Sequence, residues 1–228
     1  MDVKTFLEQP DIKNLIAAGD LEAVYREYFP HLRLPMHNYL SDYLLNKGIN
    51  PLDYFKNSIP RAAFHGCNDL TYANILDSVT EIKVGAFPFC HNLTDVKIGN
   101  SVIEIGSEAF YGCDNLTSIN IPDTVTNIGT HAFFGCGSLT SVTIGENSQL
   151  TIISNGAFGK CINLTSVTIP SSITEIGKFA FESCTSLIDI QYRGTKEQWK
   201  KITMNPVWRY NSAISTINCI DGKFVLEF

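Results

Sequence analysis

The feature that most constrains this chain is an internal repeat. The motif Ala-Phe-x-x-Cys occurs six times, with its phenylalanine at Phe64, Phe87, Phe110, Phe133, Phe158 and Phe181. Successive phenylalanines are separated by 23, 23, 23, 25 and 23 residues. Around each motif the sequence follows one frame with few substitutions: Leu-x-x-(Val/Ile)-x-Ile, another Ile farther on, then Ala-Phe-x-x-Cys. A unit this small cannot bury its own apolar side chains, so the repeats must stack and share one core.

Each unit is predicted to contain two short extended pieces and a turn. In the copy at residues 116–121, Ile119 alternates with Ser118 and Asn120, which is the two-residue period of a strand with one buried face. The second extended piece ends at Gly129, which is expected to turn the chain. The Ala-Phe-x-x-Cys segment is expected to form one helical turn, because side chains three residues apart share a helix face.

The frame resembles the leucine-rich repeats of the BspA type, also called the Treponema pallidum type. The signature L-x-x-I-x-I-P followed by I-G-x-x-A-F-x-x-C carries the resemblance over roughly residues 57–192. It implies an α/β fold, a leucine-rich-repeat solenoid of six units of about 23 residues, and a protein that binds other proteins without catalysis. Many members are bacterial surface proteins thought to bind host matrix or other cells, and related arrays occur in phage genomes.

Residues 1–56 lack the repeat and are expected to form a helical N-terminal cap. The residues that typically begin or end helices are Pro10, Gly19-Asp20, Pro30, Gly48 and Asn50-Pro51, and they indicate three to four short helices. Such a cap would cover the apolar edge of the first repeat. A separate recognition module is the alternative interpretation of the same helices.

Residues 193–228 are expected to form a helix-plus-hairpin C-terminal cap. Thr195 is the predicted N-cap of a helix that carries Trp199, and Asp221-Gly222 is typical of a two-residue hairpin turn. This stretch is similar to the module that commonly closes BspA-type arrays.

Charge argues against binding to nucleic acid or to anionic lipid. The chain has 17 Lys and Arg against 23 Asp and Glu, for a net charge of -6. Residues 61–192 hold five basic and twelve acidic groups, and no Lys or Arg occurs from Ile98 to Gly159. A polar or cationic protein surface is therefore the expected partner. We expect no nucleic acid, membrane or small-molecule substrate as partner.

The expected location is cytoplasmic, because the first eight residues contain no basic leader followed by an apolar core. Together these points predict a non-enzymatic module, intracellular in a bacterium or encoded by a phage or prophage, that occludes or scaffolds a host protein. The alternative is a bacterial cell-surface adhesin that binds host matrix or other cells, its export signal being absent from this sequence.

No catalytic, metal or cofactor site is predicted. Six of the seven cysteines occupy equivalent repeat positions, and the shortest gap between them is 22 residues, whereas paired zinc ligands are separated by about two to four. A buried row of reduced thiols is the better interpretation. The histidines, serines and glycines form no nucleophile or phosphate-binding motif. Three Asn-x-Thr sequons, at Asn92, Asn115 and Asn163, share one repeat position and are expected to act in turns rather than carry glycans.

The strand period predicts a binding surface on the outward side of the first strand of each repeat. We call the following twelve residues the sheet face: Tyr72, Asn74, Asp95, Lys97, Ser118, Asn120, Ser141, Thr143, Ser166, Thr168, Asp189 and Gln191. Its centre is Ser, Thr and Asn, and its charged groups lie toward the ends. The alternative is that Ser and Thr are simply the repeat consensus on a solvated sheet. A second candidate is the edge that carries Tyr111 and Phe134, where exposed aromatic rings would suit an interface. The alternative, which is favoured, is that these rings pack against the adjacent turn.

Overall fold

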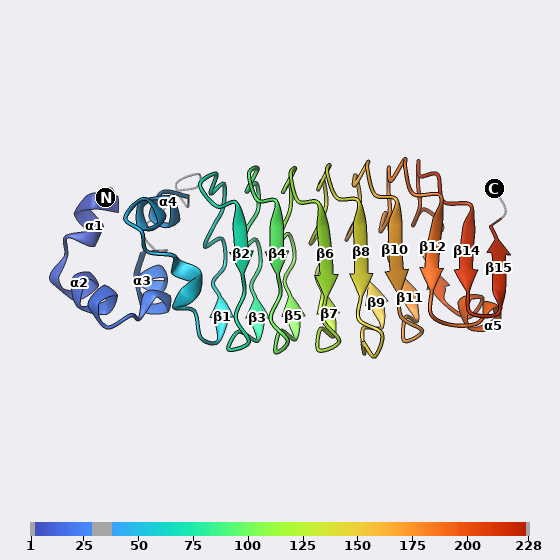
Figure 1. Cartoon of the computed structure of the whole chain (residues 1–228), viewed down its shortest axis with the longest axis horizontal. Helices are drawn as coiled ribbons and strands as arrows, with labels where there is room; N and C mark the ends of the chain where they lie inside the picture. The colour runs from blue at the N-terminus through green and yellow to red at the C-terminus, as the bar shows by residue number, and fades with distance from the viewer. Residues whose placement is uncertain (1–2, 29–37, 227–228) are drawn as a thin grey trace.

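The structure, a computed structural model, describes residues 3–28 and 38–226. Helices gather at the N-terminal end, and strands then lie side by side along the molecule to the C-terminal end (Figure 1). The helices of the N-terminal part are α1 (Val3–Leu7), α2 (Pro10–Ala17), α3 (Leu21–Tyr28), α4 (Asn38–Asn46) and a 3-10 helix at Pro51–Asp53. The helical composition expected for residues 1–56 is therefore confirmed over the described part of that segment.

The helices begin and end near the residues predicted to start or stop them. Pro10 begins α2, Asp20 accepts a hydrogen bond from the Ala23 amide at 3.1 Å, and the Asn50 side chain accepts one from Leu52 at 3.1 Å. Gly48, at φ 74°, follows α4. The predicted stop at Pro30 lies outside the described residues.

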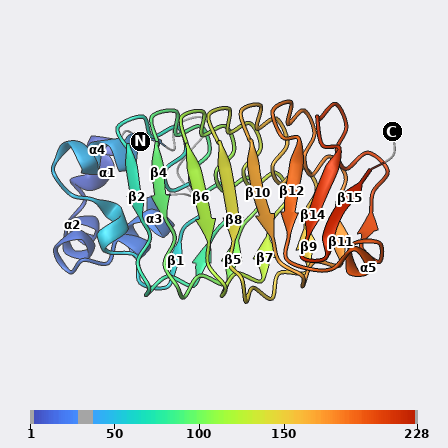
Figure 2. The same ribbon diagram turned by 45° about the vertical axis from the view of Figure 1, so that its right-hand side comes forward.

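The repeats form a coil with parallel strands on two sides (Figure 2). The longer strands are β2 (Tyr72–Asn74), β4 (Asp95–Lys97), β6 (Ser118–Ile121), β8 (Ser141–Ile144), β10 (Ser166–Ile169) and β12 (Asp189–Tyr192). The shorter ones are β1 (Ser58–Ile59), β3 (Glu81–Ile82), β5 (Glu104–Ile105), β7 (Asn127–Ile128), β9 (Ile152–Ile153) and β11 (Glu175–Ile176). Pairing keeps the repeats in step, so Ser118 lies opposite Ser141 and Ser141 opposite Ser166.

A continuous column of phenylalanine rings fills the centre of the coils. Rings of neighbouring repeats are stacked with centroids 4.9 to 5.6 Å apart and planes within 18° of parallel. Phe55 meets the first ring edge-on at 6.3 Å, and Trp208 meets the last at 6.0 Å. All six stacked rings are fully buried, so no coil has a complete core without its neighbours.

The expectation of a helical turn at Ala-Phe-x-x-Cys is wrong. In the third coil, Glu108 and Gly112 have φ of 57° and 65°, and every other coil has two left-handed residues at the same places. A right-handed helix cannot contain them. Phe110 and Cys113 still share the buried side, because the Cys113 amide donates to the Phe110 carbonyl across a tight turn at 3.3 Å.

Gly129 is required by the stacking of coils. Its φ is not left-handed, but a Cβ on it would lie 2.2 Å from the backbone nitrogen of Ser107 in the preceding coil. Gly106 is also confined, with the Val84 nitrogen 2.7 Å from an added Cβ. Glycine at this repeat position lets neighbouring coils approach within hydrogen-bonding distance.

The C-terminal module extends the solenoid. Helix α5 (Lys196–Trp199) begins at the predicted N-cap Thr195, which forms a capping box with Gln198, and carries Trp199, which is buried. Strand β13 (Thr203–Met204) pairs with β11, and β14 (Thr216–Cys219) pairs with β12. Strand β15 (Gly222–Val225) then pairs antiparallel with β14, with Cys219 opposite Gly222. The hairpin is confirmed, with its two-residue turn one residue earlier than expected.

The N-terminal helices pack directly against the first coil. The Tyr25 hydroxyl of α3 is hydrogen-bonded to Ser41 of α4, and Ser41 donates to the Ala63 carbonyl of the first coil. The Cys67 thiol donates to Asp42 at 2.8 Å. These are bonds between buried or half-buried groups, which fix the helices against the end of the array.

Candidate protein-binding face

The structure brings all twelve residues of the sheet face to one side of the solenoid. Every one of them is exposed or half-buried, whereas the strand residues between them are buried. Tyr72 is the most prominent apolar group, 46% exposed, at the N-terminal end. The predicted inward and outward sides of the strands are therefore correct.

Cross-strand register turns these side chains into two rows. Ser118, Ser141 and Ser166 form one row, and Asn120, Thr143 and Thr168 form the other. These hydroxyls and amides can donate or accept hydrogen bonds and cost little to desolvate compared with charges. Asp95 and Lys97 flank this neutral centre on one side, and Asp189 with Gln191 on the other.

Two outward positions that the sequence analysis omitted continue the rows. Thr216 lies opposite Asp189, and Asn218 lies opposite Gln191, both half-buried on β14. Thr216-Ile217-Asn218 has the same outward–inward–outward pattern as Ser118-Ile119-Asn120. The segment that contains α5 lengthens the spacing before β14, so the 23-residue period misses this strand.

Exposed threonines beside the sheet face hold the coils together. The hydroxyl of Thr140 donates to the Thr117 carbonyl at 2.9 Å, and Thr117 and Thr94 each donate in the same way to the coil before. The sequon asparagines form a parallel ladder. Asn115 Nδ2 donates to the His91 carbonyl at 2.7 Å, and Asn92 and Asn163 make matching bonds at 2.9 Å. Their predicted role in the turns is confirmed.

The repeat cysteines are free, buried and aligned. Each thiol from Cys90 onward donates to a phenylalanine carbonyl of the preceding coil, at 2.9 to 3.3 Å for Cys90, Cys113, Cys136, Cys161 and Cys184. Burial raises the pKa of the Cys136 and Cys184 thiols to about 12. These groups remain protonated, so they are poor nucleophiles and poor metal ligands.

The second predicted candidate, the edge with Tyr111 and Phe134, carries a run of partly exposed rings. Phe89 and Tyr111 are 5.3 Å apart, and Tyr111 and Phe134 are stacked at 5.4 Å. Phe89 is 39% exposed, and the other two rings are half-buried. We call Phe89, Tyr111 and Phe134 the aromatic strip.

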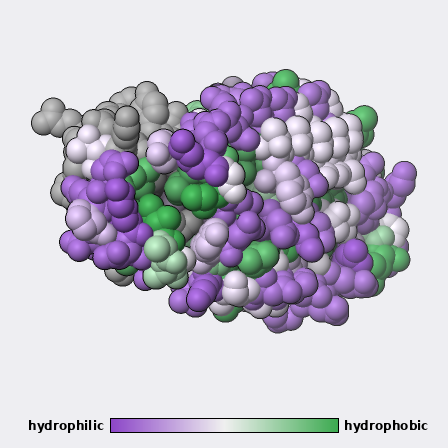
Figure 3. All heavy atoms as spheres, turned by 60° about the vertical axis from the view of Figure 1, so that its left-hand side comes forward, coloured by the Kyte–Doolittle hydropathy of each residue, from purple (hydrophilic) through white to green (hydrophobic). Residues whose placement is uncertain are grey.

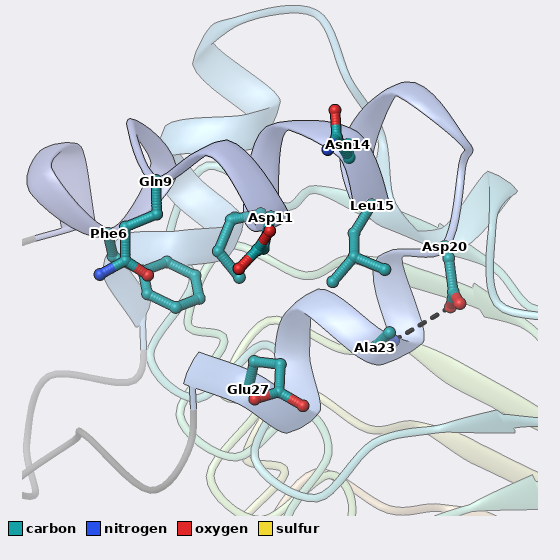
Figure 4. A pocket seen from close by; sticks show the side chains of 9 residues that line it. Phe6, Gln9, Asp11, Asn14, Leu15, Asp20, Ala23 and Glu27 are labelled. Carbon is teal, nitrogen blue, oxygen red and sulfur yellow. Dashed lines mark hydrogen bonds between the residues drawn. The ribbon is translucent and has the colours of Figure 1, made fainter.

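A hollow of about 460 Å³ lies among the N-terminal helices (Figure 4). It is lined by Phe6, Gln9, Asp11, Ile12, Asn14, Leu15, Asp20, Ala23 and Glu27. Figure 3, a space-filling view, shows hydrophobic colour gathered toward the N-terminal part beside a mainly hydrophilic solenoid surface. Asp20 is already used as the cap of α3, and nothing in the hollow points to a ligand.

The described residues contain no group of His, Cys, Asp or Glu that could hold a metal ion. His91 is paired with Asp114 at 2.8 Å on the surface. None of the helices in the described ranges is long and apolar enough to cross a membrane.

Parallel strands in register, a stacked phenylalanine core and a repeated tight turn define a leucine-rich-repeat solenoid. The model of the BspA-type leucine-rich repeat region matches residues 57–188 and 146–219 with six copies. The chain belongs to the BspA-type leucine-rich repeat family. Members of this class are typically binding scaffolds that mediate protein interactions.

Solved structures of bacterial leucine-rich repeat proteins share the fold. The T. pallidum protein TpLRR is 29% identical, with a TM-score of 0.55, over 59% of this chain and 62% of that chain. A leucine-rich repeat protein from Eubacterium ventriosum is 23% identical (TM-score 0.53) over 74% and 51% of the two chains. The pneumococcal vaccine antigen PcpA is 20% identical (TM-score 0.58) over 71% and 40%. The chain thus matches less than two thirds of each. No curated protein sequence matches it.

Proposed function

We propose that this chain is a non-enzymatic recognition module that binds one protein partner through the sheet face. The observation that carries the proposal is the register of the outward side chains. Ser141 and Ser166 lie opposite each other, Thr143 and Thr168 do the same, and none of the four is buried. A regular polar surface of this kind offers many hydrogen-bonding groups on a rigid support.

The charged ends of the sheet face would orient the partner. Asp95, Lys97 and Asp189 surround a centre with no charge, so charged groups of a partner can be paired at the rim while neutral groups meet in the middle. The acidic balance of residues 61–192 favours a partner surface with basic groups.

The row of thiols supports an intracellular setting. All seven cysteines are free, and six of them are buried. A reducing compartment preserves such a row without competing disulfides. Within that setting we propose a bacterial or prophage-encoded protein that occludes or scaffolds a host protein.

The test begins with capture of a partner from bacterial lysate, followed by measurement of its affinity for purified variants. Ser141→Arg combined with Ser166→Arg places two unpaired charges at the centre of the sheet face. We expect at least a tenfold loss of affinity, about 1.4 kcal/mol, with unchanged melting. The matched control is Ser101→Arg with Ser171→Arg, which adds the same charge in turns outside the sheet face.

Two results would count against this proposal. If both double variants bind like the wild type and melt normally, the partner does not contact the sheet face. If the Ser141 and Ser166 variant loses cooperative melting, the side chains are needed by the fold and the surface is not a free binding face.

A further inference from the structure

One residue of the aromatic strip, Phe89, occupies a backbone position that disfavours it. Phe89 has φ 58°, at the repeat position where three other coils have Gly66, Gly112 and Gly135. A left-handed backbone costs free energy for a phenylalanine and almost none for glycine. Phe89 remains 39% exposed, so burial in the core does not explain why this coil has an aromatic ring there.

Neighbouring glycines make room for the rings on the next coil. A Cβ on Gly112 would lie 2.9 Å from the Phe89 ring, and a Cβ on Gly159 would lie 2.7 Å from the Phe134 ring. The rings therefore lie against the glycine backbone of the following coil. The strip is a continuous, supported aromatic surface over three coils.

Carboxylates flank the strip, and the basic side chains that contact the Phe89 ring are histidines, His65 at 5.5 Å and His91 at 6.1 Å. Glu108 and His131 hold the same repeat position in successive coils. Because the His131 ring is 5.0 Å from Phe134, the Glu108 side chain is expected beside Tyr111, the residue equivalent to Phe134. On the other flank, Asp114 bonds His91, whose ring is 6.1 Å from Phe89. Glu108 and Asp114 are both exposed.

The chain itself shows that these rings accept cations. The Lys160 ammonium lies 5.3 Å from the centre of the Phe134 ring, and Lys178 makes a similar contact with Phe179 at 4.7 Å. No lysine or arginine within the described ranges lies over Phe89 or Tyr111. Within the described ranges, Phe89 and Tyr111 thus have partly exposed rings, carboxylates nearby and no lysine or arginine over them.

We propose that the aromatic strip is a second docking surface, which binds an arginine-bearing segment of a protein partner. A guanidinium group is planar, so it can stack on Phe89 or Tyr111 while its N–H groups donate to Glu108 or Asp114. A lysine ammonium would make the electrostatic contact without the planar stacking and the forked hydrogen bonds. The surface needs no contribution from the sheet face, so either proposal can fail alone.

The test uses three fluorescein-labelled peptides of one length, with three arginines, three lysines or three neutral citrullines spaced by glycine and serine. Fluorescence anisotropy with the full chain measures their affinities at physiological salt. The arginine peptide is expected to bind best, the lysine peptide several-fold more weakly, and the citrulline peptide at least tenfold more weakly.

Two variants assign the binding to the strip. Phe89→Gly with Tyr111→Leu removes two rings, introduces the glycine that three other coils carry, and is expected to weaken arginine-peptide binding at least tenfold without loss of cooperative melting. Glu108→Gln with Asp114→Asn keeps the rings and removes two charges, and a loss of similar size is expected. Tyr54→Ala, which removes an exposed ring outside both the sheet face and the aromatic strip, is the matched control and should leave peptide binding unchanged.

The proposal would be overturned if the arginine and lysine peptides bound equally, or if the Phe89 and Tyr111 variant bound the arginine peptide normally. General attraction to an acidic protein would then account for the peptide binding. Failure of the arginine peptide to bind would overturn the proposal as well. The Ser141→Arg and Ser166→Arg variant should retain peptide binding, which separates this result from the test of the sheet face.

Discussion

At the scale of single residues, cysteine fits its place because it combines small size with weak hydrogen bonding. The Cys136 thiol donates to the Phe110 carbonyl at 3.2 Å in a fully buried position. An alanine would leave that carbonyl without the bond, and a valine would add a branch to a tightly packed column. Cysteine at this repeat position therefore serves through its small volume and its hydrogen bond, and not through the reactivity of its thiol.

Burial should protect these thiols from alkylation even at alkaline pH. The ordinary thiol pKa of 9.0 is raised to about 12 at Cys136 and Cys184. Between these pH values an unfolded chain loses thiol protons that the folded chain keeps, so stability falls as pH rises above about 9. At pH 8 to 9 we expect iodoacetamide to label half-buried Cys219 first, and all seven cysteines only in denaturant. Mass spectrometry counts the labels, and rapid native labelling of most thiols would disprove the buried row.

At the scale of single elements, the two-residue strand period was the most informative part of the sequence. It placed Ser118 and Asn120 outward and Ile119 inward without ambiguity, because a shift of one residue would have buried the polar set. The turn was harder to predict. Phe110 and Cys113 share a face in a helix and also in a tight turn, and only the left-handed φ of Glu108 and Gly112 separates the two. No simple sequence rule requires glutamate to adopt that conformation.

The C-terminal strands show where the constant spacing of the repeats fails to predict a strand. A repeat search depends on constant spacing, and α5 lies between β12 and β14. Trp208 also stands where the other repeats have the alanine of the motif, since its carbonyl accepts a hydrogen bond from the Phe181 amide, and its ring lies 6.0 Å from Phe181. Pairing with β12 is a tertiary feature that local propensity does not encode, so Thr216 and Asn218 were missed.

Two glycines of the same region provide a matched test of coil stacking. An added Cβ on Gly129 would overlap the backbone of Ser107 at 2.2 Å, whereas nothing lies within 4 Å of one on Gly137. Gly129→Ala should cost about 3 kcal/mol or more, since two backbones would have to separate. Gly137→Ala should be neutral or stabilise by up to about 1 kcal/mol, because it lowers the entropy of the unfolded chain. Urea denaturation measures both, and equal effects would show that close approach does not explain Gly129.

At the scale of the whole molecule, stability depends on how the two ends of the array are covered. A solenoid gains most of its stability from contacts between neighbouring units, so an uncovered end exposes core side chains. At the C-terminal end, Trp208 and Trp199 are buried and their rings are 6.4 Å apart. At the N-terminal end, Phe55 packs edge-on to Phe64, and Tyr25 packs edge-on to Phe55 at 5.3 Å. The aromatic column thus continues into both terminal modules.

The N-terminal helices should therefore be inseparable from the repeats. Deletion of residues 1–56 removes Phe55 from the face of the Phe64 ring and leaves the Ala63 carbonyl without the Ser41 hydroxyl. We expect the shortened chain to aggregate or to lose its cooperative melting transition. Phe55→Ala in the full chain should give an intermediate result, a loss of about 3 to 5 kcal/mol with the helices still attached. Circular dichroism melting and light scattering distinguish these states. A shortened chain that stays monomeric and melts at the wild-type temperature would show that the helices are an independent module, and the hydrogen bonds from Ser41 and Cys67 would then contribute little to the stability of the array.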